Sequence, residues 1–71
     1  MKNVQTKYKI GSNIKKYRGK LGLTQVDLVK KSKVKYTTLS KIESGAIKTP
    51  SVQIIAKIAK ALNVSIEDLL K

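Results

Sequence analysis

Apolar residues recur along the first third of the chain at the spacing of one helix face. Ile10, Ile14, Tyr17 and Leu21 follow an i, i+4, i+7, i+11 pattern, and lysines fall between them. This period predicts an amphipathic helix from about Ile10 to Leu21. Gly22 comes next, and glycine is favoured just past a helix end.

The following stretch predicts a helix, a tight turn and a second helix. Thr24 and Asp27 are spaced as a capping box, which opens a short helix over 25–31. Ser32 and Lys33 are expected to form the turn. The inward positions of the two helices and the turn are Leu28, Val29, Val34, Leu39 and Ile42. The second helix is expected over 36–44, with Gly45 ending it.

The last third of the chain also predicts capped helices with one apolar face. Thr49 or Ser51 is expected to cap a fourth helix, which Asn63 ends in the left-handed conformation. Its inward face is expected to contain Val52, Ile55, Ile58, Ala59 and Leu62. Ser65 and Asp68 form a second capping box. That box opens a last short helix, whose apolar residues are Ile66, Leu69 and Leu70.

No segment has the alternating pattern of a strand, so the sequence predicts an all-α fold. The 71 residues suffice for one compact domain with a modest core. We expect this domain over 9–71, preceded by a flexible basic arm at 1–8.

The positive charge is large and uneven. The net charge is +12, with 13 basic and 2 acidic residues in 1–48 but only 3 basic and 2 acidic residues in 49–71. A basic segment over 1–48 and a nearly neutral segment over 49–71 indicate that one side of the molecule binds a polyanion, in particular nucleic acid. The alternative is a surface that is simply rich in lysine.

The composition also excludes several classes of protein. The chain has no Cys, no His and only four carboxylates. This leaves little for acid–base or nucleophilic catalysis, so we expect no enzyme, no metal, no cofactor and no small-molecule ligand. No apolar run is long enough to cross a bilayer and no targeting segment is evident, which predicts a cytoplasmic protein without a membrane partner.

Three segments in order resemble the Cro/cI-type (Xre-type) helix-turn-helix family. They are IGSNIKKYRGKLGLTQ, the apolar and turn positions of DLVKKSKVKYTTLSKIESG, and PSVQIIAKIAKALNVSIEDLL. The resemblance covers nearly the whole chain. It implies a five-helix, lambda-repressor-like domain in which the second and third helices form the helix-turn-helix. It also implies binding to double-stranded DNA as a transcriptional regulator, usually a repressor, in a prokaryote or phage.

The resemblance places base contacts at the start of the third helix. The positions that match are Tyr36, Thr37, Thr38, Ser40 and Lys41. Hydroxyl groups can donate to or accept from base edges, and a Thr methyl group can contact the thymine methyl. The simpler alternative for the two threonines is capping of the helix start.

The resemblance also implies contacts with the DNA backbone. The matching residues are Gln25, Lys35, Lys41, Ser44 and Lys48. In the family, the glutamine at the start of the second helix meets a phosphate and braces the recognition helix. The alternatives are a Gln chosen for helix propensity and a solvated loop lysine.

Arg18 and Glu43 match a structural ion pair of the family. Glu43 lies in the region expected to face phosphate, where a carboxylate requires a close cation. The alternative is two solvated charges with little net effect.

The turn departs from the family pattern. Val29 and Lys33 stand where Ala and Gly are common, and Lys35 stands at an N-cap position that is often Ser. Lys33 is therefore expected to adopt a left-handed conformation at a cost of about 1 kcal/mol. Val26 and Ile54 replace residues that are often polar.

Three functions remain open at this point. The first is a sequence-specific regulator, and the second is a protein-binding module on the same fold, such as an antitoxin or adaptor. The third is non-specific coating of DNA. One copy contacts few base pairs, so we expect a homodimer on a palindromic operator in the nucleoid, assembled free or only on DNA. Its interface is expected around 62–71.

Overall fold

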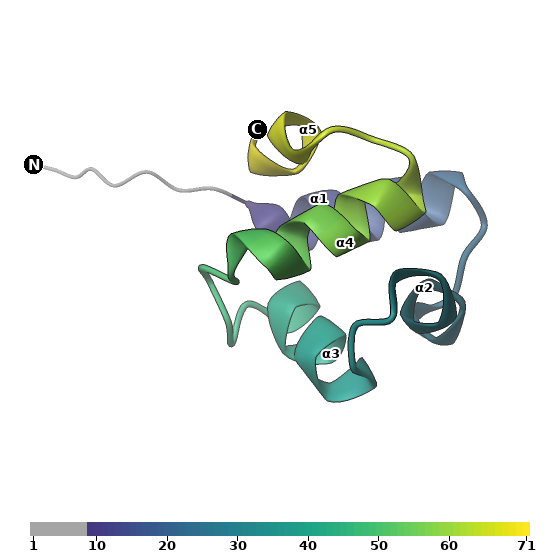
Figure 1. Cartoon of the computed structure of the whole chain (residues 1–71), viewed down its shortest axis with the longest axis horizontal. Coiled ribbons are helices and arrows are strands. Elements are labelled where there is room, and N and C mark those ends of the chain that lie inside the picture. Colours follow the sequence, from purple (N-terminus) through teal and green to yellow (C-terminus); the bar gives the residue numbers. More distant parts are fainter. Residues whose placement is uncertain (1–8) are drawn as a thin grey trace, which may run out of the picture.

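Five helices make up the fold. The computed structural model describes residues 9–71, and the expected arm at 1–8 lies outside them. The helices are α1 (Ile10–Lys20), α2 (Gln25–Ser32), α3 (Tyr36–Ser44), α4 (Val52–Leu62) and α5 (Ile66–Leu70). Within 9–71 no strand is present, which confirms the all-α prediction (Figure 1).

Two helices begin with the capping boxes that the sequence predicts. The Thr24 hydroxyl accepts from the backbone N–H of Asp27 at 3.0 Å, and the Asp27 carboxylate accepts from the N–H of Thr24 at 2.9 Å. Ser65 and Asp68 repeat the arrangement at the start of α5. In both boxes the backbone N–H donated to the carboxylate lowers the pKa of the aspartate below its usual 3.8. Ser51, rather than Thr49, caps α4.

Three helices end in a left-handed residue. Lys33, Gly45 and Asn63 have φ angles of 65°, 90° and 60°. The left-handed conformation expected at Lys33 is therefore confirmed, and it gives α2 and α3 the sharp change of direction that the helix-turn-helix needs. The chain accepts a lysine in this strained conformation where glycine would be free of strain.

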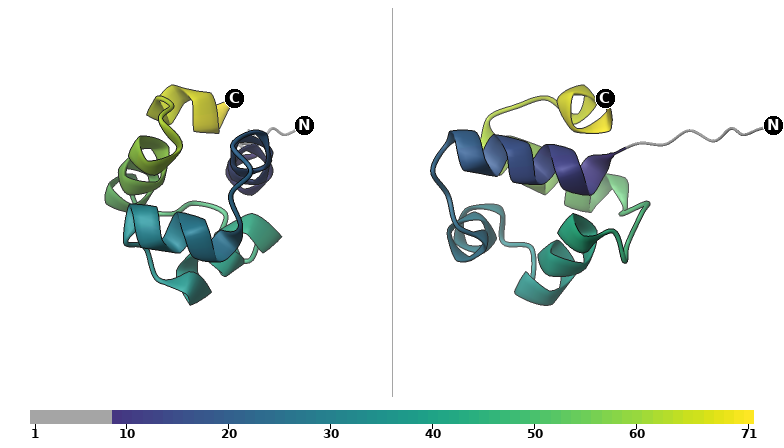
Figure 2. Two further views of the ribbon diagram at one scale, coloured as in Figure 1. Left: turned by 90° about the vertical axis from the view of Figure 1, so that its right-hand side faces the viewer. Right: turned by 180° about the vertical axis from the view of Figure 1, so that it is seen from behind.

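The core lies between α1, α4 and the helix-turn-helix. Helix α1 packs against α3, α4 and α5, while α2 packs against α3 and α4 (Figures 1 and 2). The buried apolar side chains are Ile10, Ile14, Leu28, Val34, Leu39, Ile42, Ile55, Ile58, Ala59, Leu62 and Leu69. Every helix contributes to this set, so no helix can be removed without exposing part of the core.

Some details predicted from the sequence are wrong. Leu21 and Val52 were expected to face inward but are 52% and 71% exposed, because Leu21 lies beyond the last turn of α1 and Val52 begins α4 at its outer edge. Helix α2 includes Ser32, whose buried hydroxyl accepts from the N–H of Val34 at 3.2 Å. Ile54, at a position that is often polar in the family, is partly buried and packs against the core.

Asn13 ties the end of the chain to α1. Its amide nitrogen donates to the carbonyl oxygens of Leu69 and Lys71, both at 2.8 Å. These carbonyls have no partner within a helix of five residues. The two hydrogen bonds therefore hold α5 against α1.

Gly11 sets how closely α1 approaches α3. A Cβ atom on Gly11 would overlap the carbonyl oxygen of Ile42 and lie 3.1 Å from the Cα atom of Glu43. The two helices thus meet backbone to backbone at this point. Gly19, in the same helix, has open space around it.

The two glycines of α1 predict substitutions with opposite signs. Gly11→Ala should destabilise the fold by about 1–3 kcal/mol, because the new methyl group forces α1 and α3 apart. Gly19→Ala should stabilise it by about 0.5–1 kcal/mol, because alanine favours a helix without a new contact. Urea unfolding followed by circular dichroism measures both changes. Stabilisation by both variants would show that the close approach at Gly11 is unimportant.

Candidate nucleic-acid interface

The start of α3 projects from the fold. Leu39 and Ile42 anchor the helix in the core, and Tyr36 and Thr37, one turn earlier, are exposed. Thr38 is half-buried beside them. Figure 1 shows α3 at the lower edge of the molecule, with its first turn directed away from α1 and α5. The side chains predicted to read bases therefore share an accessible helix end.

The next turn continues this surface. Ser40 and Lys41 lie four residues after Tyr36 and Thr37, so they stand on the same sides of α3. Ser40 is half-buried and Lys41 is exposed. The five residues predicted to contact bases therefore lie together on the first two turns of α3, a helix of nine residues.

Backbone N–H groups add to the positive character of this end. Lys35 occupies the N-cap position of α3, and its side chain makes no capping hydrogen bond. The first N–H groups of a helix have no partner within it and favour anions. Since Lys35 is also exposed, its ammonium group and these N–H groups offer an anion two kinds of contact.

A buried carboxylate holds α3 in place from behind. Glu43 accepts from Arg18 twice, at 2.9 Å from Nε to Oε2 and 2.9 Å from Nη2 to Oε1. Its side chain is only 3% exposed, whereas that of Arg18 is 20% exposed. The remaining Arg18 nitrogen donates to the carbonyl oxygen of Leu23 at 3.0 Å. The ion pair expected from the sequence is present, and it joins α1 to the end of α3.

Gln25 completes this arrangement from α2. Its Nε2 donates to Oε1 of Glu43 at 2.9 Å, so Glu43 accepts hydrogen bonds from both neighbouring helices. We call Arg18, Gln25 and Glu43 the Glu43 network. The bracing role implied for Gln25 is therefore seen directly, whereas its phosphate contact stays a prediction.

The remaining predicted residues lie after α3. The Ser44 hydroxyl donates to the carbonyl oxygen of Lys41 at 3.1 Å and accepts from the N–H of Ala46 at 3.4 Å, so it also shapes the turn. Lys48 is exposed in the loop that follows. With Lys9 and Lys15 it borders a depression of about 630 Å³ between the start of α1 and the end of α3.

Three features of the site were not found from the sequence. They are the Gly11 contact with α3, the Gln25–Glu43 hydrogen bond and the buried Ser32 hydroxyl. Each joins residues through the tertiary fold or depends on burial. Two signals were available. One was a glycine at a helix start, which has several ordinary explanations. The other was the bracing role that the family resemblance implied for Gln25, which did not name Glu43 as its partner.

A metal centre and a membrane span were both sought in the described part of the chain. No group of three or more acidic, His or Cys side chains in 9–71 can hold a metal ion. Within the same residues, no helix is long and apolar enough to span a membrane.

Comparison with known proteins identifies the family. Residues 14–69 match the helix-turn-helix family. An uncharacterised HTH-type transcriptional regulator of Archaeoglobus fulgidus is 40% identical over 58 residues, which are 82% of this chain and 81% of that protein. The HTH-type transcriptional regulator SinR of Bacillus subtilis is 38% identical over 61 residues, and this match spans only 55% of SinR.

Solved structures agree with the sequence matches. SinR in complex with DNA superimposes with a TM-score of 0.84 at 37% identity, covering 87% of this chain and 98% of that one. The P22 c2 repressor in complex with a synthetic operator superimposes with a TM-score of 0.77 at 31% sequence identity. This match covers 87% of this chain and 92% of the repressor chain. With its five helices and its matched turn, the chain belongs to the Cro/cI-type helix-turn-helix family.

Proposed function

We propose that this protein is a transcriptional regulator, acting as a repressor, that binds a specific site on double-stranded DNA with α3 in the major groove. The observation that carries the proposal is the exposed first turn of α3, fixed from behind by the Glu43 network. A rigid helix with an accessible polar end is suited to reading base edges. SinR, solved in complex with DNA, and the P22 c2 repressor, solved in complex with a synthetic operator, support DNA as the partner.

The residues of α3 have different roles in this proposal. Thr37 and Thr38 read base edges through their hydroxyl and methyl groups, and Ser40 does so one turn later. Tyr36 stacks on a sugar or binds a phosphate with its hydroxyl. Lys41 reaches a phosphate or guanine at the edge of the groove.

Contacts with the DNA backbone surround the recognition helix. Gln25 and the free N–H groups at the start of α2 bind phosphate on one side of the groove, while Ser44 and Lys48 do so on the other. Lys35 adds a contact at the mouth of α3. Such contacts supply affinity and its salt dependence, while base contacts supply sequence choice.

Substitutions on the two kinds of contact should have different effects. Thr37→Ala with Thr38→Ala should weaken binding to operator DNA, enriched from a random pool, by about 1–3 kcal/mol while leaving random DNA nearly unaffected. Lys48→Gln should weaken both DNAs alike and reduce the salt slope by about one unit. Fluorescence titrations at several salt concentrations measure both quantities.

Lys16→Gln provides the control, since it removes one charge from an exposed residue of α1 that the proposal assigns neither to a DNA contact nor to the dimer interface. Equal losses on operator and random DNA from the double threonine change would contradict base reading by α3.

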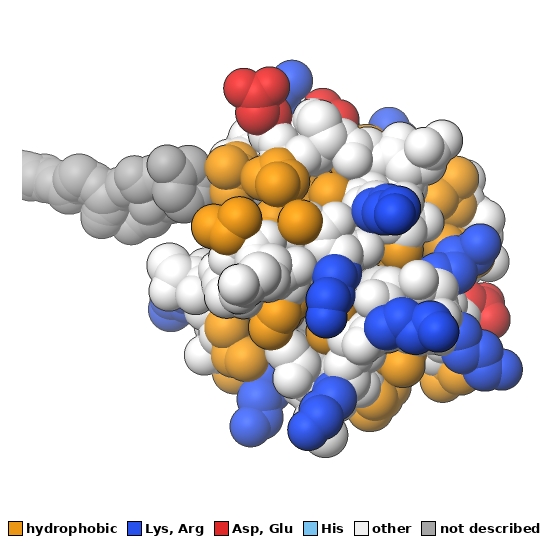
Figure 3. Space-filling view, in the orientation of Figure 1, with side chains coloured by type: hydrophobic (Ala, Val, Ile, Leu, Met, Phe, Trp, Pro, Cys, Tyr) orange, Lys and Arg blue, Asp and Glu red, His pale blue; other side chains and the backbone are white. Residues whose placement is uncertain are grey.

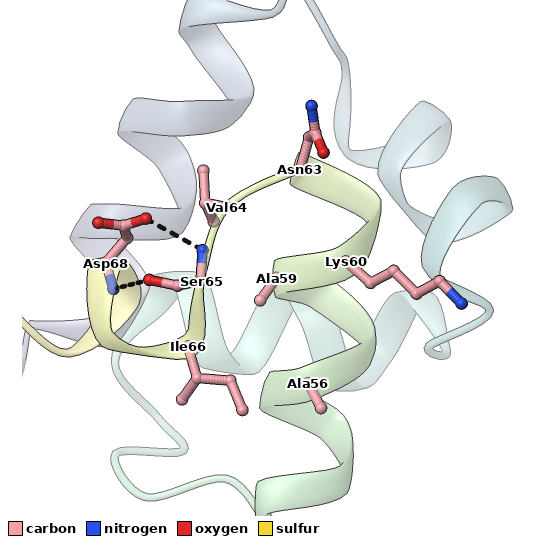
Figure 4. Close-up of a pocket in the computed structure, with 8 residues that line it drawn as sticks. All are labelled: Ala56, Ala59, Lys60, Asn63, Val64, Ser65, Ile66 and Asp68. Carbon is pink, nitrogen blue, oxygen red and sulfur yellow. Dashed lines mark hydrogen bonds between the residues drawn. The ribbon is translucent and has the colours of Figure 1, made fainter.

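We further propose that the protein binds a palindromic operator as a homodimer, in the nucleoid DNA of the cytoplasm. The exposed Val52 and Ile66 and the half-buried Ala56 form an apolar patch across α4 and α5, in which Val52 and Ala56 are four residues apart on one helix. Figure 3 shows apolar side chains gathered on this side of the molecule, and Figure 4 shows Ile66 near Ala56. The proposed interface thus extends beyond the expected 62–71 to the start of α4.

A charge placed in this patch should disrupt the dimer. Val52→Glu should reduce the Hill slope for operator binding from about 2 to about 1, because two like charges meet across the two-fold axis. Leu21→Glu introduces the same charge at another exposed apolar residue outside the patch, and it should leave the slope unchanged. Sedimentation with labelled operator provides the stoichiometry. A 2:1 complex that survives Val52→Glu would contradict this interface.

A further inference from the structure

A second basic surface lies away from the recognition helix. Lys31 and Lys33 at the end of α2, and Lys57 and Lys60 on α4, are all exposed and border one shallow depression of about 600 Å³. Ser32 and Ala61 form the rest of its wall. We call these four lysines the α2–α4 lysine cluster.

No carboxylate of the described residues forms an ion pair with the cluster, although the pKa of Asp27, lowered mainly by the hydrogen bond from the backbone N–H of Thr24, is also lowered by the nearby charge of Lys31. Among residues 9–71, the ion pairs are Arg18–Glu43 and Lys71–Asp68, and neither involves a cluster lysine. Four positive charges around one depression produce a positive potential there, and their mutual repulsion opposes folding. Charges of this kind are stabilised when a polyanion binds.

The cluster faces a different direction from α3. Helix α4 packs on α2, and the residues that line the depression all belong to α4 and to the end of α2. Figure 3 shows lysines spread over the side of the molecule formed by α4 and α2, apart from the apolar side chains near α5. In Figure 4, Lys60 extends away from Ala56 and Ile66. A duplex seated on α3 therefore leaves Lys57 and Lys60 unoccupied.

We infer that the α2–α4 lysine cluster binds the phosphate backbone of a second DNA segment while α3 occupies the operator, so that one domain bridges two duplexes. This inference rests on the proposed function. DNA suits the cluster because it carries one charge per about 1.7 Å of helix axis, which four mobile ammonium groups can match without a fixed geometry. A protein partner is disfavoured because the depression offers no large apolar or aromatic anchor, and protein interfaces depend on such anchors.

A capture experiment tests the second surface. Operator DNA on beads is saturated with the protein, unbound protein is washed away, and a labelled random duplex is added at several salt concentrations. Since both recognition helices of a dimer are already occupied, capture reports a separate surface. Lys57→Gln with Lys60→Gln is compared with Lys16→Gln with Lys20→Gln, which removes the same charge from exposed positions on α1. Glutamine is a good helix former, so both variants should remain folded, which circular dichroism checks.

The wild type and the α1 variant should capture the labelled duplex. In the α4 variant, operator binding should be retained, whereas the salt slope of capture should fall by about 1.8 units, because each lost phosphate contact removes about 0.9. Equal capture by all three proteins, or an equal decrease in both variants, would overturn the inference. So would retention of polyglutamate in place of DNA, which would indicate an acidic protein partner. Failure to retain protein on the operator would instead contradict the proposed function, and it is measured first on the same beads.

Discussion

The buried carboxylate of Glu43 is the group on which the geometry of this protein depends. It receives three N–H groups, two from Arg18 on α1 and one from Gln25 on α2, although it belongs to the third helix. A buried charge without such partners would be strongly destabilising, so the three helices are held in one arrangement. Gly11 permits this arrangement, because any side chain at that position would separate α1 from the backbone that carries Glu43.

The arrangement of these three helices also determines where the different kinds of side chain lie on the surface. With its end tied to α1 and α2, α3 presents its first turn outward, and the phosphate-binding residues proposed on either side belong to α2 and to the loop after α3. The clustered lysines of α2 and α4 border a separate depression, and the apolar residues near the start of α4 and α5 lie apart from both surfaces. The basic residues that give the net charge of +12 are therefore not spread evenly over the surface.

Local features could be predicted from the sequence because their causes are local. Both capping boxes and the left-handed Asn63 are where short-range patterns place them, and the left-handed Lys33 is where the family resemblance implies it. Errors arose where neighbours decide the outcome. Periodicity assigned Leu21 and Val52 to the core, yet no other helix covers them. Likewise, the hydrogen bond from Gln25 to Glu43 spans 18 residues and follows from the packing of α2 on α3, which spacing along the chain does not reveal. The Arg18–Glu43 pair was anticipated only through the family resemblance.

The free energy of unfolding of Glu43→Gln tests most directly whether the Glu43 network holds the fold together. Glu67→Gln is the matched control, since it makes the same chemical change at an exposed residue of α5. Removing one partner of a buried ion pair should cost about 3 kcal/mol, because Arg18 then lacks its countercharge, whereas the control should change the unfolding free energy by less than about 1 kcal/mol. Equal small losses in urea unfolding would contradict the role assigned to Glu43.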